Sequence, residues 1–426
     1  MHRRLTQANH TEVCLMRKLT LALMGCSLAV PALAGAAESP SQLFTDGKAY
    51  LDLRYRYEHV DQNNALKNAN AQTLRSRIGL QSGSFAGFSA LIEADNVSRI
   101  GDMKYNSTRN RQGQYSVVTD PDGTEINQAL LRYTHELGQA TVGRQRINLD
   151  NQRFVGGVAW RQNEQTYDGA LLALKPLDGL TLTYGYIDQV NSIFGPDGTN
   201  NFPDNPANIE GHSHLLNASY QLRPEATVTL YQYRLGLDNL QNGAQSSKTT
   251  GVRVAGKVQG WDYAAEYARQ RDWADNPLNL SSKYYLVEAG TNFADLAVKA
   301  GYEVLGGDNR TGNRAFQTPL ATKHTFQGWA DVFLTTPAAG ITDAWIGGSY
   351  PVLGGRLQAW YHDFRADKGS QRYGNEVNLG WGRAVPGVKG LQALVKYASY
   401  DSKQGNAVAG RTEDTDKLWL QLQYSL

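Results

Sequence analysis

The sequence predicts an all-β protein, a transmembrane antiparallel β-barrel of about 18 strands with short periplasmic turns and long extracellular loops. Three observations support this fold class: apolar and polar side chains alternate along most of the chain, a secretory signal precedes them, and no cysteine follows that signal. Successive side chains of a strand lie on opposite faces, so alternation creates one apolar and one polar face. Strands of an outer-membrane barrel need both, because one face meets lipid and the other meets the lumen.

The N-terminus predicts an upstream extension and a secretory signal peptide over residues 1–34. Met16-Arg17-Lys18 forms a short basic region, residues 19–30 are mostly apolar, and Ala32-Leu33-Ala34 is a small-residue cleavage site. Met16 is the expected start of translation. Residues 35–426 then form a single outer-membrane β-barrel domain, since no linker or second composition follows.

Cysteine and charge exclude several classes of protein. Cys14 and Cys26 both lie in the predicted leader, so we expect no disulfide, no metal site and no cofactor in the mature chain. The whole chain has 42 Lys+Arg and 40 Asp+Glu; residues 1–34 hold four and one of these, which leaves 38 against 39. This balance gives no reason to expect a nucleic-acid partner.

Strand candidates follow one another in phase. They include residues 48–58, 73–81, 180–186, 252–258, 261–267, 296–304 and 416–426. In the last of them, Leu418, Leu420 and Leu422 share one face, while Trp419 and Gln421 share the other. Charged residues fall between apolar ones without a break in phase, whereas a helix would distribute them around its circumference.

Turns and loops alternate between the strands. Short turn signals stand at residues 175–179, 223–225, 259–260, 294–295, 351–355 and 386–390, and long polar stretches at residues 63–70, 104–124, 191–211, 237–248, 306–323, 365–372 and 402–416. Short turns at one end and long loops at the other are typical of an outer-membrane barrel. Residues 140–148 and 227–235 leave the phase open. Either of residues 104–124 and 191–211 could fold inward as a constriction or remain a solvated extracellular loop.

Basic residues recur on the predicted lumen face, mixed with acidic ones. The candidates are Arg54, Arg56, Arg75, Arg77, Arg132, Arg144, Arg146, Arg153, Arg161, Arg253, Lys257 and Arg356. Guanidinium presents a rigid fork of donors to a carboxylate, and a row of such groups along a pore would attract anions and pass them on. The alternative is that these cations pair with inward acidic residues and brace the wall.

Four segments carry a resemblance to a known family. They are TLRSRIG at residues 73–79, residues 88–97, GTEINQALLRY at residues 123–133, and the stretch from Gly143 to Gly169. Together they resemble the alginate export family of outer-membrane barrels. The resemblance implies a monomeric 18-stranded barrel with an electropositive lumen, which in the archetype conducts an anionic uronic-acid polymer outward. It also implies that Arg75, Arg77, Arg132, Arg144, Arg146, Arg153 and Arg161 line the path.

Three functions remain open at this point. The first is a passive channel for anionic solutes that exports an acidic, alginate-like polysaccharide, and the second is a general or carboxylate-nutrient uptake porin. The third is a structural barrel with no open lumen or a hydrolase at the barrel rim, for which His212-Ser213-His214 is the only histidine cluster. No nucleophile motif accompanies that cluster, so we expect no catalytic residue and no enzyme. The expected partners are outer-membrane lipid and lipopolysaccharide, an anionic saccharide or small carboxylate, and periplasmic export proteins.

Overall fold

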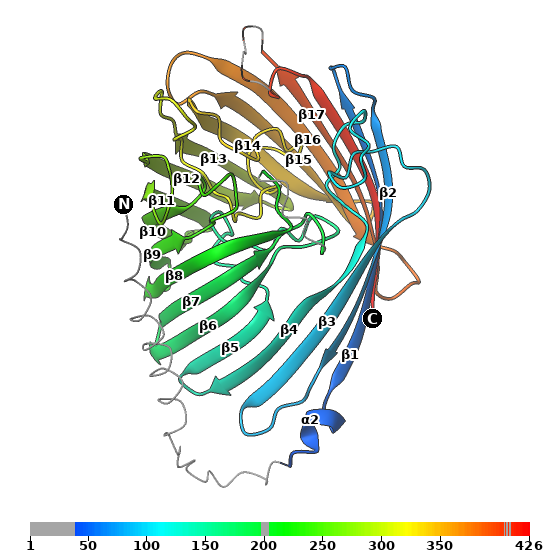
Figure 1. Ribbon diagram of the computed structural model, residues 1–426, viewed down its shortest axis with the longest axis vertical. Helices are drawn as coiled ribbons and strands as arrows, with labels where there is room; N and C mark the ends of the chain where they lie inside the picture. The colour runs from blue at the N-terminus through cyan, green and yellow to red at the C-terminus, as the bar shows by residue number, and fades with distance from the viewer. Residues whose placement is uncertain (1–38, 197–203, 404, 406–407, 409) are drawn as a thin grey trace, which may run out of the picture. The chain divides into compact units, whose positions relative to one another are not determined.

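The computed structural model describes residues 39–426 except 197–203, 404, 406–407 and 409, so the predicted leader lies outside the described residues. One short helix, α2 (Gln42–Thr45), precedes the strands (Figure 1). The strands are β1 (Lys48–Gln62), β2 (Ala69–Gln81), β3 (Phe88–Arg99), β4 (Gly123–His135), β5 (Gly138–Gln145), β6 (Thr166–Leu177), β7 (Leu180–Asn191), β8 (Asn208–Arg223), β9 (Ala226–Leu235), β10 (Ser247–Val258), β11 (Trp261–Asp272), β12 (Ser281–Phe293), β13 (Leu296–Gly306), β14 (Gly340–Val352), β15 (Gly355–Arg365), β16 (Arg372–Ala384), β17 (Leu391–Ser402) and β18 (Thr415–Ser425). None of the described helices has the length and apolar character required to span a bilayer.

The strands form one closed antiparallel sheet. Each strand pairs with its sequence neighbours, and β1 pairs with β18, for example through Arg56 opposite Gln421. Closure leaves no sheet edge with unpaired backbone groups, which a membrane would penalise by several kcal/mol per group. The 18-stranded barrel predicted from the alternation is therefore confirmed.

The two faces of the barrel differ as the alternation predicts. Leu230, Val287 and Ile346 are more than half exposed, because they belong to the outward face that meets lipid. In β18, Leu420 and Leu422 lie outward and exposed, whereas Trp419 lies inward and is fully buried. The alternation of outward and inward side chains is therefore the same in the C-terminal strand as in the central strands.

The short turns gather at one end of the barrel. Ala86-Gly87, Gln259-Gly260 and Leu353-Gly354 each have positive φ at both residues, which is the geometry of a type I′ hairpin turn. The long connections lie at the other end, between β3 and β4, β5 and β6, β7 and β8, and β13 and β14. The turn end is thus periplasmic and the loop end extracellular.

Two long connections fold into the barrel. These are residues 146–165, here called the β5–β6 loop, and residues 307–339, the β13–β14 loop. Phe154 of the first and Phe316 of the second are buried in one cluster with inward wall residues such as Tyr231 and Tyr284. A short parallel bridge between Val155 and Leu320 joins the two loops. Because both loops pack on inward wall residues, they occupy part of the barrel interior.

The inward segments match the expected ones only in part. Of the two expected candidates, residues 104–124 reach inward: Tyr105 and Val118 pack on the extracellular ends of β1 and β2, and Asp120 is fully buried. The segment 191–211 is described only in part. The polar stretch expected at 306–323 extends to residue 339, because Trp329, Val332 and Phe333 pack inside the barrel instead of forming a strand.

Candidate functional site

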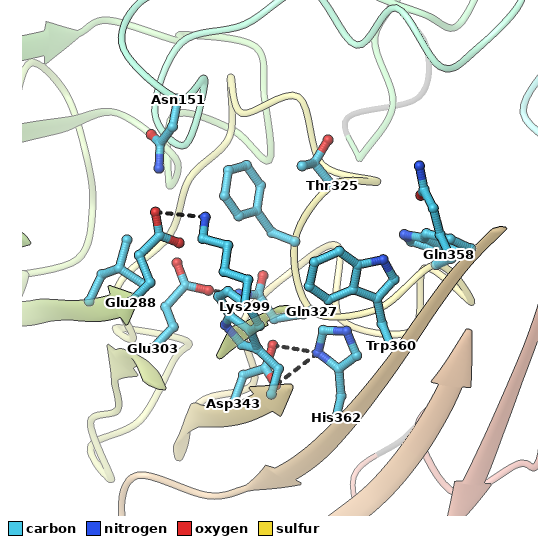
Figure 2. Close-up of a pocket in the computed structure, with 14 residues that line it drawn as sticks. Asn151, Glu288, Lys299, Glu303, Thr325, Gln327, Asp343, Gln358, Trp360 and His362 are labelled. Atoms are coloured by element: carbon cyan, nitrogen blue, oxygen red, sulfur yellow. Dashed lines mark hydrogen bonds and ion pairs between the residues drawn. The ribbon is translucent and has the colours of Figure 1, made fainter. Parts of the chain in front are cut away.

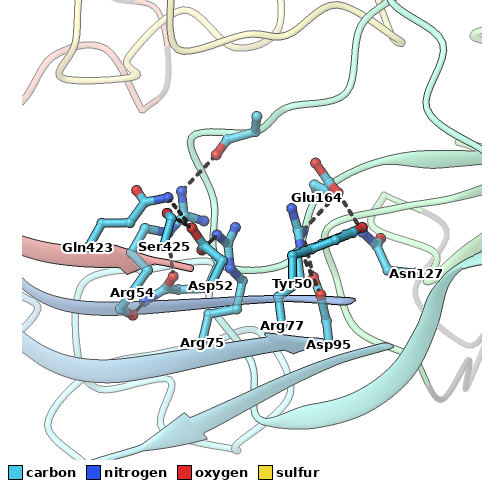
Figure 3. Close-up of polar contacts among 12 residues, drawn as sticks. Tyr50, Asp52, Arg54, Arg75, Arg77, Asp95, Asn127, Glu164, Gln423 and Ser425 are labelled. Atoms are coloured by element: carbon cyan, nitrogen blue, oxygen red, sulfur yellow. Dashed lines mark hydrogen bonds and ion pairs between the residues drawn. The ribbon is translucent and has the colours of Figure 1, made fainter. Parts of the chain in front are cut away.

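The centre of the site is an arginine cluster on the inner face of β1 and β2. Arg54 and Arg56 alternate with outward tyrosines on β1, and Arg75 and Arg77 occupy the inward parity of β2. The register sets Arg54 directly opposite Arg75 and Asp52 opposite Arg77 (Figure 3). Arg54, Arg56 and Arg75 are each at most 5% exposed. Burying such a set requires that each guanidinium find acceptors.

Arg54 binds the backbone of the β5–β6 loop. Its Nη1 donates to the carbonyl oxygen of Ala159 at 3.0 Å, and its Nη2 donates to that of Arg161. Its Nε donates to the side-chain oxygen of Gln162 at 2.9 Å. Arg54 makes no ion pair within the described part of the chain, so it holds the loop through neutral acceptors alone.

Arg56 is bound less completely. It donates to Gln421 of β18 at 2.6 and 3.1 Å, and its guanidinium lies 4.0 Å from the centre of the Trp160 ring. Its nearest carboxylate oxygen, on Asp120 of the β3–β4 loop, is 4.0 Å away. Arg56 Nη1 and Asp120 Oδ2 both lack a hydrogen-bond partner. Arg56 is therefore a buried cation with spare donor capacity.

Arg75 and Arg77 are paired with carboxylates. Arg75 binds Asp52, which also accepts hydrogen bonds from Gln423 and Ser425 of β18 and so ties the closing seam of the barrel (Figure 3). Arg77 binds both oxygens of Asp95, at 2.7 and 2.6 Å, and Glu164 at 2.8 Å. These two arginines brace the wall, which is the alternative that the sequence left open.

The remaining loop arginines pin the loops. Arg146 shares Glu93 and Glu164 with Arg77. Arg153 donates from Nε to Glu303 of β13 at 2.7 Å. Its other nitrogens donate to Thr318 at 3.1 Å and Gln327 at 3.0 Å, both in the β13–β14 loop.

Arg161 joins three elements. Its nitrogens lie 3.0 Å from Glu58 of β1, 3.1 Å from Asp331 of the β13–β14 loop and 3.8 Å from Asp120 of the β3–β4 loop. Burial by itself would lower the pKa of Arg161, but these carboxylates outweigh it and raise the pKa. Arg161 thus stays charged and links the wall to both inward loops.

Trp160 is the aromatic centre of the same region. The imidazole of His324 stacks on it, with centroids 4.3 Å apart and planes 2° from parallel. Lys396 Nζ lies 4.1 Å from the Trp160 ring and 2.7 Å from His324 Nε2. Two cations and one imidazole on one indole form a cation–π assembly inside the barrel. We call this region the throat cluster. Its members are connected by ion pairs, hydrogen bonds or ring contacts: Trp160, the basic residues Arg54, Arg56, Arg161, Lys396 and Lys417, the acidic residues Glu58, Asp120 and Asp331, and His324.

Burial keeps His324 neutral. Desolvation, with the ammonium group of Lys396 nearby, lowers the pKa of His324 to about 3. Its Nδ1 lies 3.0 Å from Asp331 Oδ1, so the ring bridges the carboxylate and the lysine.

Sequence reasoning did not find this part of the site. Lys396 and Trp419 have the inward parity of their strands, so the alternation could have included them. Trp160, His324 and Asp331 lie on irregular loops, where no two-residue rhythm signals direction.

The other predicted cations are spread over the wall. Arg253 binds Glu266 at 2.8 Å, Lys257 lies 3.5 Å from Asp262 near the periplasmic end, and Arg356 donates to Ser349 at 2.8 Å. Arg132 has inward parity and is half-buried. None of these four contacts the throat cluster through an ion pair or hydrogen bond that involves described residues.

Arg144 is a correction. It shares the parity of Val142, which is 50% exposed on the outward face, and it binds Asp168 at 2.7 and 2.8 Å. Strand geometry therefore places Arg144 outside the lumen. The alternation within residues 140–148 did not show which side chains point inward, because β5 is short and ends at residue 145.

A chamber of about 320 Å³ adjoins the inward loops (Figure 2). The indoles of Trp329, Trp345 and Trp360 line it, together with ion pairs between Lys299 and Glu288 at 3.0 Å and between His362 and Asp343 at 3.0 Å. A Cβ atom on Gly301 or Gly347 would come within 2.3 Å of Trp345 or Trp360, respectively, so these glycines make room for the rings. Flat indoles beside carboxylates and amides suit a ring that has one apolar face and a polar edge.

The histidine cluster at residues 212–214 does not assemble a catalytic pair. His212 and His214 share the outward parity of Leu216 and contact Tyr186 at 2.9 Å and Tyr184 at 3.0 Å. Ser213 lies on the opposite face, where its hydroxyl donates to the carbonyl oxygen of Gly236 at 3.2 Å. A serine nucleophile must contact its histidine base, which this alternation prevents. No metal-binding group of three or more His, Cys, Asp or Glu side chains occurs in the described ranges.

Comparison with known proteins agrees with this architecture. Residues 48–331 match the family model described as alginate export. Among curated proteins, no sequence matches the chain. Among solved structures, OccK3 (OpdO) of Pseudomonas aeruginosa is similar, with a TM-score of 0.66, 17% identity, and coverage of 91% of this chain and 97% of that one. OccAB2 of Acinetobacter baumannii has a TM-score of 0.69 and 15% identity, with 90% of this chain and 99% of that one covered. At this identity the two structures establish the fold alone; with the family match, they confirm the predicted location in the bacterial outer membrane.

Proposed function

The chain belongs to the alginate export family, and from that premise we propose that it is a passive outer-membrane channel for small anionic solutes, with sugar acids as the best-fitting class. The observation that carries the proposal is the charge of the throat cluster. Five basic side chains, Arg54, Arg56, Arg161, Lys396 and Lys417, lie among three carboxylates, Glu58, Asp120 and Asp331. An excess of basic groups beside a pore favours anions.

The inward loops and the adjoining chamber favour a small solute. Loops that are pinned by buried ion pairs reduce the passage of an 18-stranded barrel, which without them would leave a wide aqueous channel. The tryptophan-lined chamber beside the loops can hold one or two sugar rings, since its volume is about 320 Å³. A uronic acid combines the carboxylate that the throat would attract with the ring that the indoles would stack.

Export of an acidic polysaccharide is the second candidate, and family membership is what favours it. A polymer would have to pass residues 146–165 and 307–339, so its passage requires both loops to withdraw. The two candidates therefore differ in whether a long chain crosses or merely blocks the channel.

Planar-bilayer recording on the purified protein tests the proposal. We expect an anion-selective current, flux of galacturonate, and block by longer oligogalacturonates without their passage. Replacing Lys396 and Lys417 together by glutamine should lower the anion preference at least twofold, whereas Lys104→Gln, at an exposed loop pair, should leave it unchanged. A cation-selective current would refute the proposal, and translocation of long oligomers would favour polymer export.

Acid should loosen the throat. The folded pKa of His324 lies below the value of about 6.5 that a released imidazole has, so docking of the β13–β14 loop is strongest above pH 6.5 and weakens as pH falls toward 3. The loss is at most about 1.4 kcal/mol per pH unit. We expect more frequent high-conductance openings at pH 4.5 than at pH 7.5 in the same recordings.

The control for the acid effect is a matched pair of variants. His324→Gln should remove most of the difference between the two pH values, and His135→Gln, at an exposed turn, should retain it. An acid response that survives in His324→Gln would assign the effect to another group.

A further inference from the structure

Five cations gather on the outward face near the extracellular ends of β9 to β12. We call them the basic outer patch: Arg234, Lys248, Arg269, Arg271 and Lys283. Each has the outward parity of an exposed apolar residue on its own or the adjoining strand, such as Leu230, Tyr267 and Tyr285. Each also lies on the loop side of those residues. The patch therefore follows directly on the lipid-facing apolar band, at the level where the bilayer meets water.

The register makes these residues neighbours. Lys248 lies opposite Arg234 on one side and opposite Arg271 on the other, and Arg269 lies opposite Lys283. Side chains directly opposite on one face are about 5 Å apart at Cβ, and like charges there destabilise the sheet. Such an arrangement calls for an anion to neutralise it.

The protein does not supply that anion among its described residues. Arg234 donates to Gln232 at 2.7 Å and lies 5.1 Å from the ring of Trp273, and Lys248 lies 5.8 Å from the same ring. No ion pair involves any member of the patch in the part of the chain that the structure describes. Asp272, next in sequence to Arg271, has inward parity and accepts a hydrogen bond from the backbone of Leu280.

A second outward cluster provides the contrast. Arg365 and Arg372, at the extracellular ends of β15 and β16, share the carboxylate of Asp363 at 3.0 and 2.9 Å. Cations at this second cluster are thus neutralised internally, whereas the adjacent cations of the basic outer patch have no carboxylate partner among the described residues.

We propose that the basic outer patch binds the phosphate groups of a phosphorylated glycolipid of the outer leaflet, lipopolysaccharide. The occupant must be anionic at the level of the patch and apolar immediately below it, because Leu230, Tyr267 and Tyr285 adjoin the cations. Guanidinium and phosphate form bidentate, charge-assisted hydrogen bonds. Trp273 lies where an interfacial indole packs against headgroups. The site is independent of the lumen, so its test does not depend on the proposed transport function.

Binding is measured on the purified, refolded protein in detergent. The probes are lipopolysaccharide, the same lipopolysaccharide after enzymatic dephosphorylation, and inorganic phosphate. We expect Arg269→Gln/Arg271→Gln/Lys283→Gln to weaken lipopolysaccharide binding at least tenfold. The matched control, Arg365→Gln/Arg372→Gln, should change it less than twofold. Dephosphorylation should weaken binding to the parent protein to a similar extent as the triple substitution.

Two outcomes of these binding measurements would contradict lipopolysaccharide binding at the basic outer patch. Undiminished binding by the triple variant, or equal binding of the dephosphorylated lipid, would overturn it. Inorganic phosphate that binds as tightly as the lipid would overturn the assignment to a glycolipid. Heat-modifiable electrophoretic migration equal to that of the parent shows that the variant is folded. Lys283→Gln alone, with an expected loss of about threefold, replaces the triple variant if the triple variant does not fold.

Discussion

Replacing Arg161 by methionine should raise the single-channel conductance several-fold while the barrel stays closed. The substitution leaves Glu58, Asp120 and Asp331 without their shared cation, in a region where all three carboxylates are at most 5% exposed. Removal of one partner from a buried ion pair costs about 3–5 kcal/mol, because the remaining charge is desolvated and unpaired. The loops are the least regular part of the fold, so we expect the β5–β6 loop to leave the wall before the strands separate.

Conductance in planar bilayers measures this change. Lys104→Met, which removes an exposed loop cation paired with exposed Asp102, is the control and should leave conductance unchanged, because exposed pairs contribute little. Resistance of the variant to proteolysis of its strands, with new cleavage within residues 146–165, would show that only the loop was released. A variant with parental conductance would mean that Arg161 does not hold the throat.

Trp160→Ala should release both inward loops together. Trp160 is stacked on His324 of the β13–β14 loop and contacts Arg56 and Lys396 on the wall, at 4.0 and 4.1 Å. Trp160 is half-buried, so its replacement by alanine should cost less than the roughly 3–5 kcal/mol of a fully buried aromatic residue, but this ring also screens the two cations from each other. We expect a larger rise in conductance than a single wall contact would give, with loss of anion selectivity as the throat widens.

The control for Trp160→Ala is Trp381→Ala. Trp381 lies on the outward parity of β16 and donates to the carbonyl oxygen of Val352, away from the lumen. Its replacement should leave conductance and selectivity at parental values. Equal effects of the two substitutions would indicate a general loss of folding instead of release of the loops.

The sequence was sufficient to predict the wall of this barrel. Parity identified the inward positions of Arg54, Arg56, Arg75 and Arg77, because a strand with one lipid face has only one permitted register. Parity was not sufficient for Arg144, because β5 is a short strand that ends at Gln145 and its phase could not be assigned from the sequence.

The interior could not be predicted in the same way. Residues 146–165 and 307–339 hold Arg161, Trp160, His324 and Asp331 in place through contacts with strands far away in sequence. No local pattern encodes such contacts, since an irregular loop has no fixed period. Whether an arginine serves transport or bracing depends on these partners: Arg77 is fully paired, whereas Arg54 binds only neutral groups.

The size limit for neutral polymers is the most direct test of whether the two inward loops determine the width of the channel. Conductance is recorded while polyethylene glycols of increasing mass are added to the parent protein and to a variant in which a short Gly-Ser linker replaces residues 148–163. We expect that only the smallest polymers reduce the parental conductance, and that the variant admits much larger ones. An identical size limit in both proteins would contradict it.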